Sequence, residues 1–186
     1  NSQFGTVVLR KETDPEGGIG FDFFSDFGIP IPDFRLDHGM TLTFTLPAYT
    51  YTVTETLPVD WELRWFACET DDTNDTSSWG GNVVTIDVDA GETITCTFDN
   101  SQLGTIVIEK QTDPPGGTGF DFLDNIGIPT FSLDDGIAWT FPYVPAGTYT
   151  VTEAAPPSPF DLIEVDCEDP DDGSSIDLDA RTATID

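Results

Sequence analysis

Apolar and polar residues alternate in short segments along almost the whole chain, and no segment has the 3.6-residue period of an amphipathic helix. The segments are rich in Val, Ile, Thr, Phe and Tyr, and turns of Gly, Pro and Asp separate them. Alternation places successive side chains on opposite faces of a strand, so one face of each segment is expected to be buried. The pattern predicts an all-β protein built from short strands.

This pattern of strands and turns occurs twice. The first copy opens with GTVVLRKETDPEGG from Gly5, and the second opens with GTIVIEKQTDPPGG from Gly104. Each copy is long enough for a β-sandwich, and only three residues separate the two. We therefore predict two tandem Ig-like sandwich domains arranged end to end, residues 1–103 and 104–186. Further matched segments are 20–30 with 119–129, 36–39 with 133–136, 51–55 with 149–153, 62–69 with 162–168, and 82–87 with 182–186.

The second copy is shorter than the first. Residues 88–100 of the first copy, VDAGETITCTFDN, form an expected last strand that has no counterpart after residue 186. The opening residues 1–3 match residues 100–102, where the first copy ends. We expect the second sandwich to lack its own last strand, and the chain to be an excerpt from a longer array. The alternative is that a neighbouring subunit supplies the strand.

The charge of the chain excludes several classes of partner. It has 35 acidic and six basic residues, a formal net charge of −29. Little is available to neutralise phosphates, so nucleic acid is not an expected partner. No apolar run approaches the ~20 residues of a membrane span. With 38% hydrophobic residues the chain can fill two cores, so the acidity is typical of a solvated extracellular surface rather than of disorder.

Three polar residues fall on strand faces that are otherwise apolar: Lys11, Glu55 and Asn100. Lys11, for example, shares its face with Val7 and Leu9. Each of the three lies near the end of its apolar stripe, so a sandwich can gather them at one end of its core. An ammonium group there is costly unless it is paired or chemically consumed.

Two interpretations of this group are open. Burial lowers the pKa of a lysine and raises that of a glutamic acid, so a neutral amine can attack the Asn carboxamide while the acid helps ammonia leave. The product is a Lys–Asn isopeptide bond. The alternative is a buried Lys–Glu ion pair with an Asn hydrogen bond. The second copy repeats the lysine and the glutamate as Lys110 and Glu153.

The strand ending in KETD, the YTVTE segments and the terminal strand ending in Asn100 resemble the Cna protein B-type domain. The resemblance implies a prealbumin-like (transthyretin-like) sandwich of the kind found in Gram-positive pilins and adhesin stalks. It also implies a Lys11–Asn100 isopeptide bond catalysed by Glu55, with Lys110 and Glu153 in the same roles and their acceptor outside the chain. Two features depart from the family pattern. A cysteine pair is not usual in the pilin members, and no LPxTG sorting signal is present.

The cysteines follow the repeat. Cys68 and Cys96 bound the acidic loop of the first copy, and Cys167 matches Cys68. An exported repeat favours a Cys68–Cys96 disulfide over two buried thiols. The expected partner of Cys167 would belong to the absent last strand.

The acidic loops are weak candidates for a Ca²⁺ site, because carboxylate oxygens suit this ion but the spacing is not that of an EF-hand. No other cofactor is expected. Asn74 opens a glycosylation sequon, also a weak signal. The Ca²⁺ candidates are Asp71, Asp72, Asp75, Asp169, Asp171 and Asp172.

The sequence thus predicts a structural repeat of an extracellular stalk, fibre or cell-surface filament, whose partners are neighbouring repeats or copies of itself. The alternative is an adhesin-type module whose acidic loops bind Ca²⁺ or a surface ligand. An enzyme is not expected, because the chain has one histidine and no cofactor motif or paired base and nucleophile.

Overall fold

The computed structural model describes residues 4–28, 33–70, 76–170 and 172–186. The chain forms two compact units, residues 1–102 and 103–186. Strands are the only regular elements among the described residues, so the all-β prediction is confirmed. No helix in these ranges is long and apolar enough to cross a membrane.

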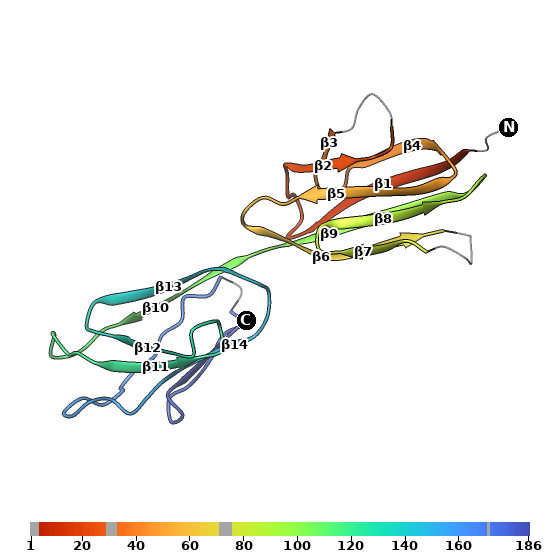
Figure 1. The fold of residues 1–186 in the computed structure, drawn as a ribbon. Helices are drawn as coiled ribbons and strands as arrows, with labels where there is room; N and C mark the ends of the chain where they lie inside the picture. Colours follow the sequence, from red (N-terminus) through yellow and green to blue (C-terminus); the bar gives the residue numbers. More distant parts are fainter. Residues whose placement is uncertain (1–3, 29–32, 71–75, 171) are drawn as a thin grey trace. The chain divides into compact units, whose positions relative to one another are not determined.

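The first unit is a sandwich of two sheets (Figure 1). One sheet has the order β4-β1-β9-β6, and its strands are β1 (Phe4–Asp14), β4 (Thr41–Pro47), β6 (Trp61–Glu69) and β9 (Thr93–Gln102). The other has the order β3-β2-β5-β8-β7, and its strands are β2 (Phe21–Ser25), β3 (Asp33–Leu36), β5 (Tyr49–Thr56), β7 (Ser78–Gly80) and β8 (Val83–Val88). The inward side chains of both sheets share one core.

Strand β1 is one of the two central strands of the first sheet. It pairs antiparallel with β4 on one edge and parallel with β9 on the other. Its alternate residues Val7, Leu9 and Lys11 are fully buried, as the alternation predicts. The parallel register places Leu9 opposite Cys96 and Lys11 opposite Phe98. The first and last strands of the unit therefore run side by side in the same direction.

The second unit repeats most of this plan. Its larger sheet has the order β12-β11-β14-β16-β15, with β11 (Phe120–Asp124), β12 (Thr130–Leu133), β14 (Tyr149–Glu153), β15 (Ser175–Asp177) and β16 (Thr182–Ile185). The facing sheet consists of β10 (Gly104–Lys110) and β13 (Ile137–Val144), the counterparts of β1 and β4. A smaller core of aromatic and aliphatic residues lies between the sheets.

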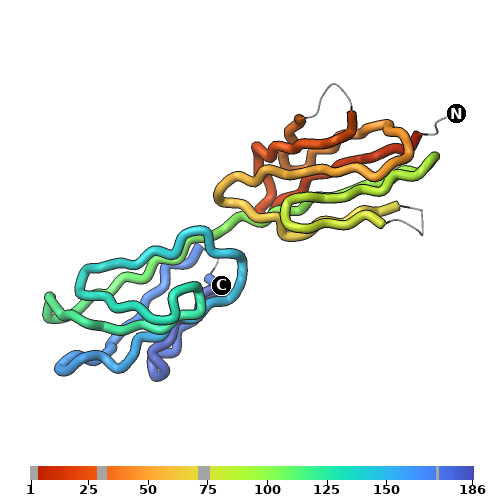
Figure 2. Tube along the Cα trace, in the orientation of Figure 1, coloured from red at the N-terminus to blue at the C-terminus, as the bar shows by residue number. Residues whose placement is uncertain are grey.

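One sequence expectation for the second unit is wrong. Residues 162–168 match part of β6, yet residues 154–170 contain no strand and are drawn without an arrow in Figure 1. Figure 2 traces the course of the same segment. In the first unit β6 is an edge strand, and β9 is its one neighbour in the sheet. The described part of the second unit has no strand in the place of β9. A lone segment cannot satisfy its backbone hydrogen bonds as a strand, so residues 162–168 stay irregular.

Candidate functional site

The fold brings Lys11, Glu55 and Asn100 together in the core of the first unit. Lys11 is on β1, Asn100 is on the neighbouring β9, and Glu55 is on β5 in the facing sheet. Their exposed fractions are 0%, 1% and 0%. The alternation of each strand turns the three side chains inward, and the parallel register of β1 and β9 sets the lysine beside the amide.

The lysine amine lies against the amide. Lys11 Nζ donates a hydrogen bond of 2.6 Å to Asn100 Oδ1, and others of 2.6 Å to the carbonyl of Glu12 and 3.3 Å to that of Phe98. The same nitrogen is 3.7 Å from Glu55 Oε1 and 4.2 Å from the centre of the Phe21 ring. The amine is therefore held at the amide group of Asn100.

The environment shifts both titratable groups toward their neutral forms. Burial lowers the pKa of Lys11 to about 8, an effect that the carboxylates of Glu55 and Asp99 only partly offset. Burial also raises the pKa of Glu55, against the opposing influence of Lys11 and Asn100. A neutral amine is a nucleophile, and a protonated carboxyl is a general acid. The site thus has the parts for attack on the carboxamide.

The site also contains unsatisfied polar atoms. Both carboxyl oxygens of Glu55 and the Nδ2 of Asn100 are buried and have no hydrogen bond of standard geometry, although Glu55 Oε1 is within ion-pair distance of Lys11 Nζ. Each such group costs about 1–3 kcal/mol relative to its hydrated state. A reaction that removes the amide nitrogen relieves part of this cost.

Two neighbours of the site were not expected from the sequence. Strand alternation places Asp99 on the outward face of β9, yet it is only 7% exposed. Arg64 on β6 donates a 2.8 Å hydrogen bond from Nε to Asp99 Oδ1 and reaches Asp14 with Nη1. The bulge of β6 between Leu63 and Trp65 lies at this point of the strand. Alternation alone does not reveal that an arginine of the next strand covers the outward carboxylate.

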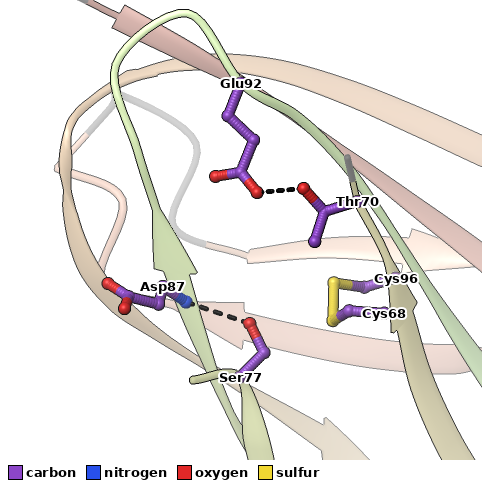
Figure 3. The surroundings of a disulfide bond; sticks show 6 residues. All are labelled: Cys68, Thr70, Ser77, Asp87, Glu92 and Cys96. Carbon is purple, nitrogen blue, oxygen red and sulfur yellow. Dashed lines mark hydrogen bonds between the residues drawn. A yellow bond between two sulfur atoms is a disulfide. The ribbon is translucent and has the colours of Figure 1, made fainter. Parts of the chain in front are cut away.

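Cys68 and Cys96 form the disulfide expected from the sequence, between directly paired positions of β6 and β9. Figure 3 shows its surroundings, where Thr70 donates a hydrogen bond to Glu92 across the same pair of chain segments. The bond closes a separation of 28 residues. It ties β9, the strand that carries Asn100, to the edge of the sheet.

The second unit has the same lysine and glutamate in a more open setting. Lys110 Nζ is 3.2 Å from Glu153 Oε2 and 4.6 Å from the centre of the Phe120 ring. Glu153 Oε1 is buried and has no hydrogen-bond partner. Cys167 is a free, half-buried thiol, and burial raises its pKa.

No metal site is found in the described ranges, where no three His, Cys, Asp or Glu side chains are grouped to hold an ion. Asp169 accepts a 2.7 Å hydrogen bond from the backbone nitrogen of Ser174. Asp172 has a left-handed backbone, with φ of 60°. The remaining Ca²⁺ and glycosylation candidates lie outside the described residues: Asp71, Asp72, Asn74, Asp75 and Asp171.

A family model described as a prealbumin-like fold domain matches residues 7–102. Among solved structures, a bacterial adhesin from Mobiluncus mulieris with intramolecular disulfide, isopeptide and ester cross-links is 17% identical, with a TM-score of 0.41. The match covers 54% of this chain and 42% of the adhesin, less than half of its length.

Two further structures are similar. The Bacillus anthracis TIE protein is 16% identical with a TM-score of 0.38, over 82% of this chain and 29% of that protein. A shaft pilin from Lactobacillus rhamnosus GG is 15% identical with a TM-score of 0.34, over 87% of this chain and 90% of the pilin. No curated protein sequence matches the chain.

Proposed function

The chain belongs to the family of prealbumin-like fold domains, and we propose that it is a structural repeat of an extracellular stalk, fibre or surface filament, locked by an isopeptide bond between Lys11 and Asn100. The observation that carries the proposal is the buried contact of 2.6 Å between Lys11 Nζ and Asn100 Oδ1, with the Glu55 carboxyl 3.7 Å from the same amine.

The bond forms in one substitution at the amide carbon. The neutral Nζ of Lys11 attacks Cγ of Asn100, and a new C–N bond forms. The protonated Glu55 carboxyl polarises the amide oxygen, then transfers a proton to Nδ2 as the old C–N bond breaks. Ammonia leaves with the original amide nitrogen. Glu55 recovers its proton from the attacking amine, so nothing is oxidised or reduced.

The other features of the first unit suit a structural role outside the cell. The Cys68–Cys96 disulfide is of a kind that persists in oxidising compartments. The net charge of −29 keeps a repetitive surface soluble. Neighbouring repeats, or copies of the chain, are the partners that such a role requires. Both covalent links stabilise the same strand, β9, in its sheet.

The test is the intact mass of the folded chain under reducing conditions. The wild-type chain is expected to weigh one ammonia less than its sequence, and fragment spectra should show Lys11 joined to Asn100. Glu55→Ala and Asn100→Ala should each restore the full mass. Glu153→Ala is the matched control in the second unit and should keep the deficit. A full mass for the folded wild-type chain means that the group is only an ion pair, and the proposal fails.

A further inference from the structure

The one histidine of the chain lies in the turn between β3 and β4 of the first unit, beside the end of β1. The backbone N–H of Thr13 donates a 3.0 Å hydrogen bond to Nδ1 of His38. A ring nitrogen that accepts an N–H has no proton of its own, so the imidazole is neutral here and its proton is on Nε2. The hydrogen bond therefore requires the unprotonated form of Nδ1.

An acid faces the same ring nitrogen. Oε2 of Glu12 is 3.5 Å from Nδ1 of His38, and the two side chains are 23% and 22% exposed. Nδ1 cannot bind both neighbours at once. Without a proton it accepts from the Thr13 amide, and with a proton it donates to the Glu12 carboxylate. One proton on Nδ1 thus decides between two hydrogen bonds.

Two further charged groups lie near this pair. Arg10, also on β1, donates a 2.6 Å hydrogen bond to Oε1 of Glu12 and leaves Oε2 to the histidine. Asp37 precedes His38 in the turn, and its Oδ1 accepts from the backbone nitrogen of Gly20 at 2.7 Å. The groups that can exchange partners are therefore Glu12 and His38, because Asp37 is held by its own backbone contact.

The second unit has a different pair at the matching positions, where Asp135 replaces the histidine and Gln111 replaces the glutamate. The Asp135 carboxylate accepts from the backbone nitrogens of Thr112 at 2.7 Å and Gly116 at 2.9 Å. These hydrogen bonds, from Gly116 and from Thr112, lower the pKa of Asp135, so it remains an acceptor in mild acid. Of the two acceptors, the imidazole is the one of a type that titrates between pH 5 and 8.

The Thr13 amide anchors the turn that follows β1. Thr13 is 5% exposed, and its Oγ1, 3.2 Å from the same ring nitrogen, is already engaged by the turn. It accepts from the backbone nitrogen of Gly18 at 3.1 Å and donates to the carbonyl of Pro15 at 2.8 Å. Gly18 packs so closely against Trp61 that a Cβ there would lie 2.8 Å from the ring. The same turn lines an open cleft of about 410 Å³ together with Pro58 and Trp61. Loss of the Thr13 hydrogen bond would loosen the turn and this side of the cleft together.

We propose that His38 is a pH-dependent latch on the first unit. The neutral ring holds the Thr13 amide and keeps the turn at residues 15–20 closed. The protonated ring donates to Glu12 and releases the amide, so the turn opens locally in mild acid. A proton moves from solvent to Nδ1, and no covalent bond between heavy atoms changes. The second unit has no such response, because its acceptor stays ionised. The latch does not depend on the cross-link proposed for the first unit.

The test measures amide hydrogen exchange in the full chain by NMR at pH 7.5 and pH 5.0, with each rate divided by that of an unstructured amide at the same pH. The protection of the Thr13 amide should fall about tenfold in acid, as expected for the loss of one hydrogen bond. Thr112, in the same sample, is the internal control and should keep its protection. The ¹⁵N resonance of His38 Nδ1 should become that of a protonated nitrogen over the pH range in which Thr13 loses protection.

Two variants test the parts of the latch. Glu12→Gln removes the partner of the protonated ring and should lower the pH at which Thr13 is released by about 0.5 pH unit. Glu12→Gln combined with His38→Asp copies the pair of the second unit, and its Thr13 amide should keep its protection at both pH values. The second unit already folds around this pair, so the double variant is expected to fold.

Each outcome decides the proposal. Protection lost at Thr13 and kept at Thr112 supports the latch. Equal protection of Thr13 at both pH values overturns it, as does a fall that Thr112 shares, since that fall cannot come from His38. A Thr13 amide that is still released in acid in the double variant overturns it as well. The intact mass, which tests the proposed function, is independent of all these results.

Discussion

The two units contain the same lysine and glutamate, and they differ in how completely these residues are enclosed. The side chains of Lys11 and Glu55 are fully buried, whereas those of Lys110 and Glu153 are 11% and 6% exposed. The amine of Lys11 makes three hydrogen bonds, two of them to atoms of β9. The hydrogen bond found for the amine of Lys110 is the one to Glu153.

The comparison shows what β9 adds to the lysine and glutamate that both units share. Strands β1 and β10 have nearly the same sequence, so the difference arises from β9, which covers one edge of β1 and supplies Asn100. Desolvation of the lysine, the acceptor amide and the disulfide all depend on this one strand. On the proposed function, a repeat of this kind can form its cross-link only when its last strand is in place.

The largest expected effect is loss of the proposed Lys11–Asn100 cross-link. Asn100→Ala should lower the free energy of unfolding of the first unit by about 4–5 kcal/mol, because the bond closes a loop of about 90 residues in the unfolded chain. Chemical unfolding followed by Trp fluorescence reports mainly on this unit, which contains Trp61, Trp65 and Trp79.

Lys110→Met combined with Glu153→Leu is the comparison in the second unit. It should lower the stability of that unit by no more than about 1 kcal/mol, because both members of the buried pair are removed together. If this double change destabilises its unit as much as Asn100→Ala destabilises the first, loss of a cross-link does not explain the effect of Asn100→Ala.

Removal of the disulfide is the next largest effect. Cys68→Ala with Cys96→Ala should lower the stability of the first unit by about 3–4 kcal/mol in the loop-entropy account, plus any packing loss. A thiol reagent added to the denatured, unreduced wild-type chain should label Cys167 alone. Cys167→Ala, as control, should leave unfolding of the first unit unchanged. Labelling of Cys68 at full stoichiometry would contradict the disulfide.

The pH dependence of the unlinked first unit gives a smaller effect. Burial lowers the pKa of Lys11 from 10.5 to about 8, so between these values the unfolded chain binds more protons than the folded one. The stability of the Asn100→Ala variant should therefore rise from pH 8 toward pH 10, by roughly 1–3 kcal/mol.

The control combines Lys11→Met with Asn100→Ala and should flatten this rise. Denaturant midpoints at a series of pH values measure both variants. A midpoint that falls over the same range would mean that the Lys11 ammonium is stabilised, not destabilised, by the fold.

The smallest effect on the stability of the first unit is expected for Arg64, which lies at the surface beside the site. Arg64→Ala removes the hydrogen bonds to Asp99 and Asp14, but the Arg64 side chain is about half exposed. A loss of about 0.5–1 kcal/mol is expected for the first unit. The residue at the matching position is Ile163, and Ile163→Ala is the control for the second unit. A loss as large as that of Asn100→Ala would make Arg64 part of the site.

Alternation and the internal repeat were sufficient to predict the strands, the inward lysine and glutamate, and the cysteine pair. These depend on period and on matched positions, which a single sequence displays. The state of residues 162–168 could not be predicted in this way, because a strand needs a neighbour as well as a suitable pattern. Nor could the burial of Asp99, which depends on Arg64 reaching across from another strand.

The parallel pairing of β1 with β9 also determines how the first unit would transmit a pulling force. A pull along the chain enters through β1 and leaves through β9 toward Gly104. These strands are neighbours and run in the same direction, so the force shears their whole ladder of hydrogen bonds at once.

With Lys11 joined to Asn100, the tension would pass from one strand to the other at that bond. The residues between them, a sequence separation of 89, would carry no load. When it unfolds under force, a cross-linked unit would therefore lengthen by about 300 Å less than an unlinked unit.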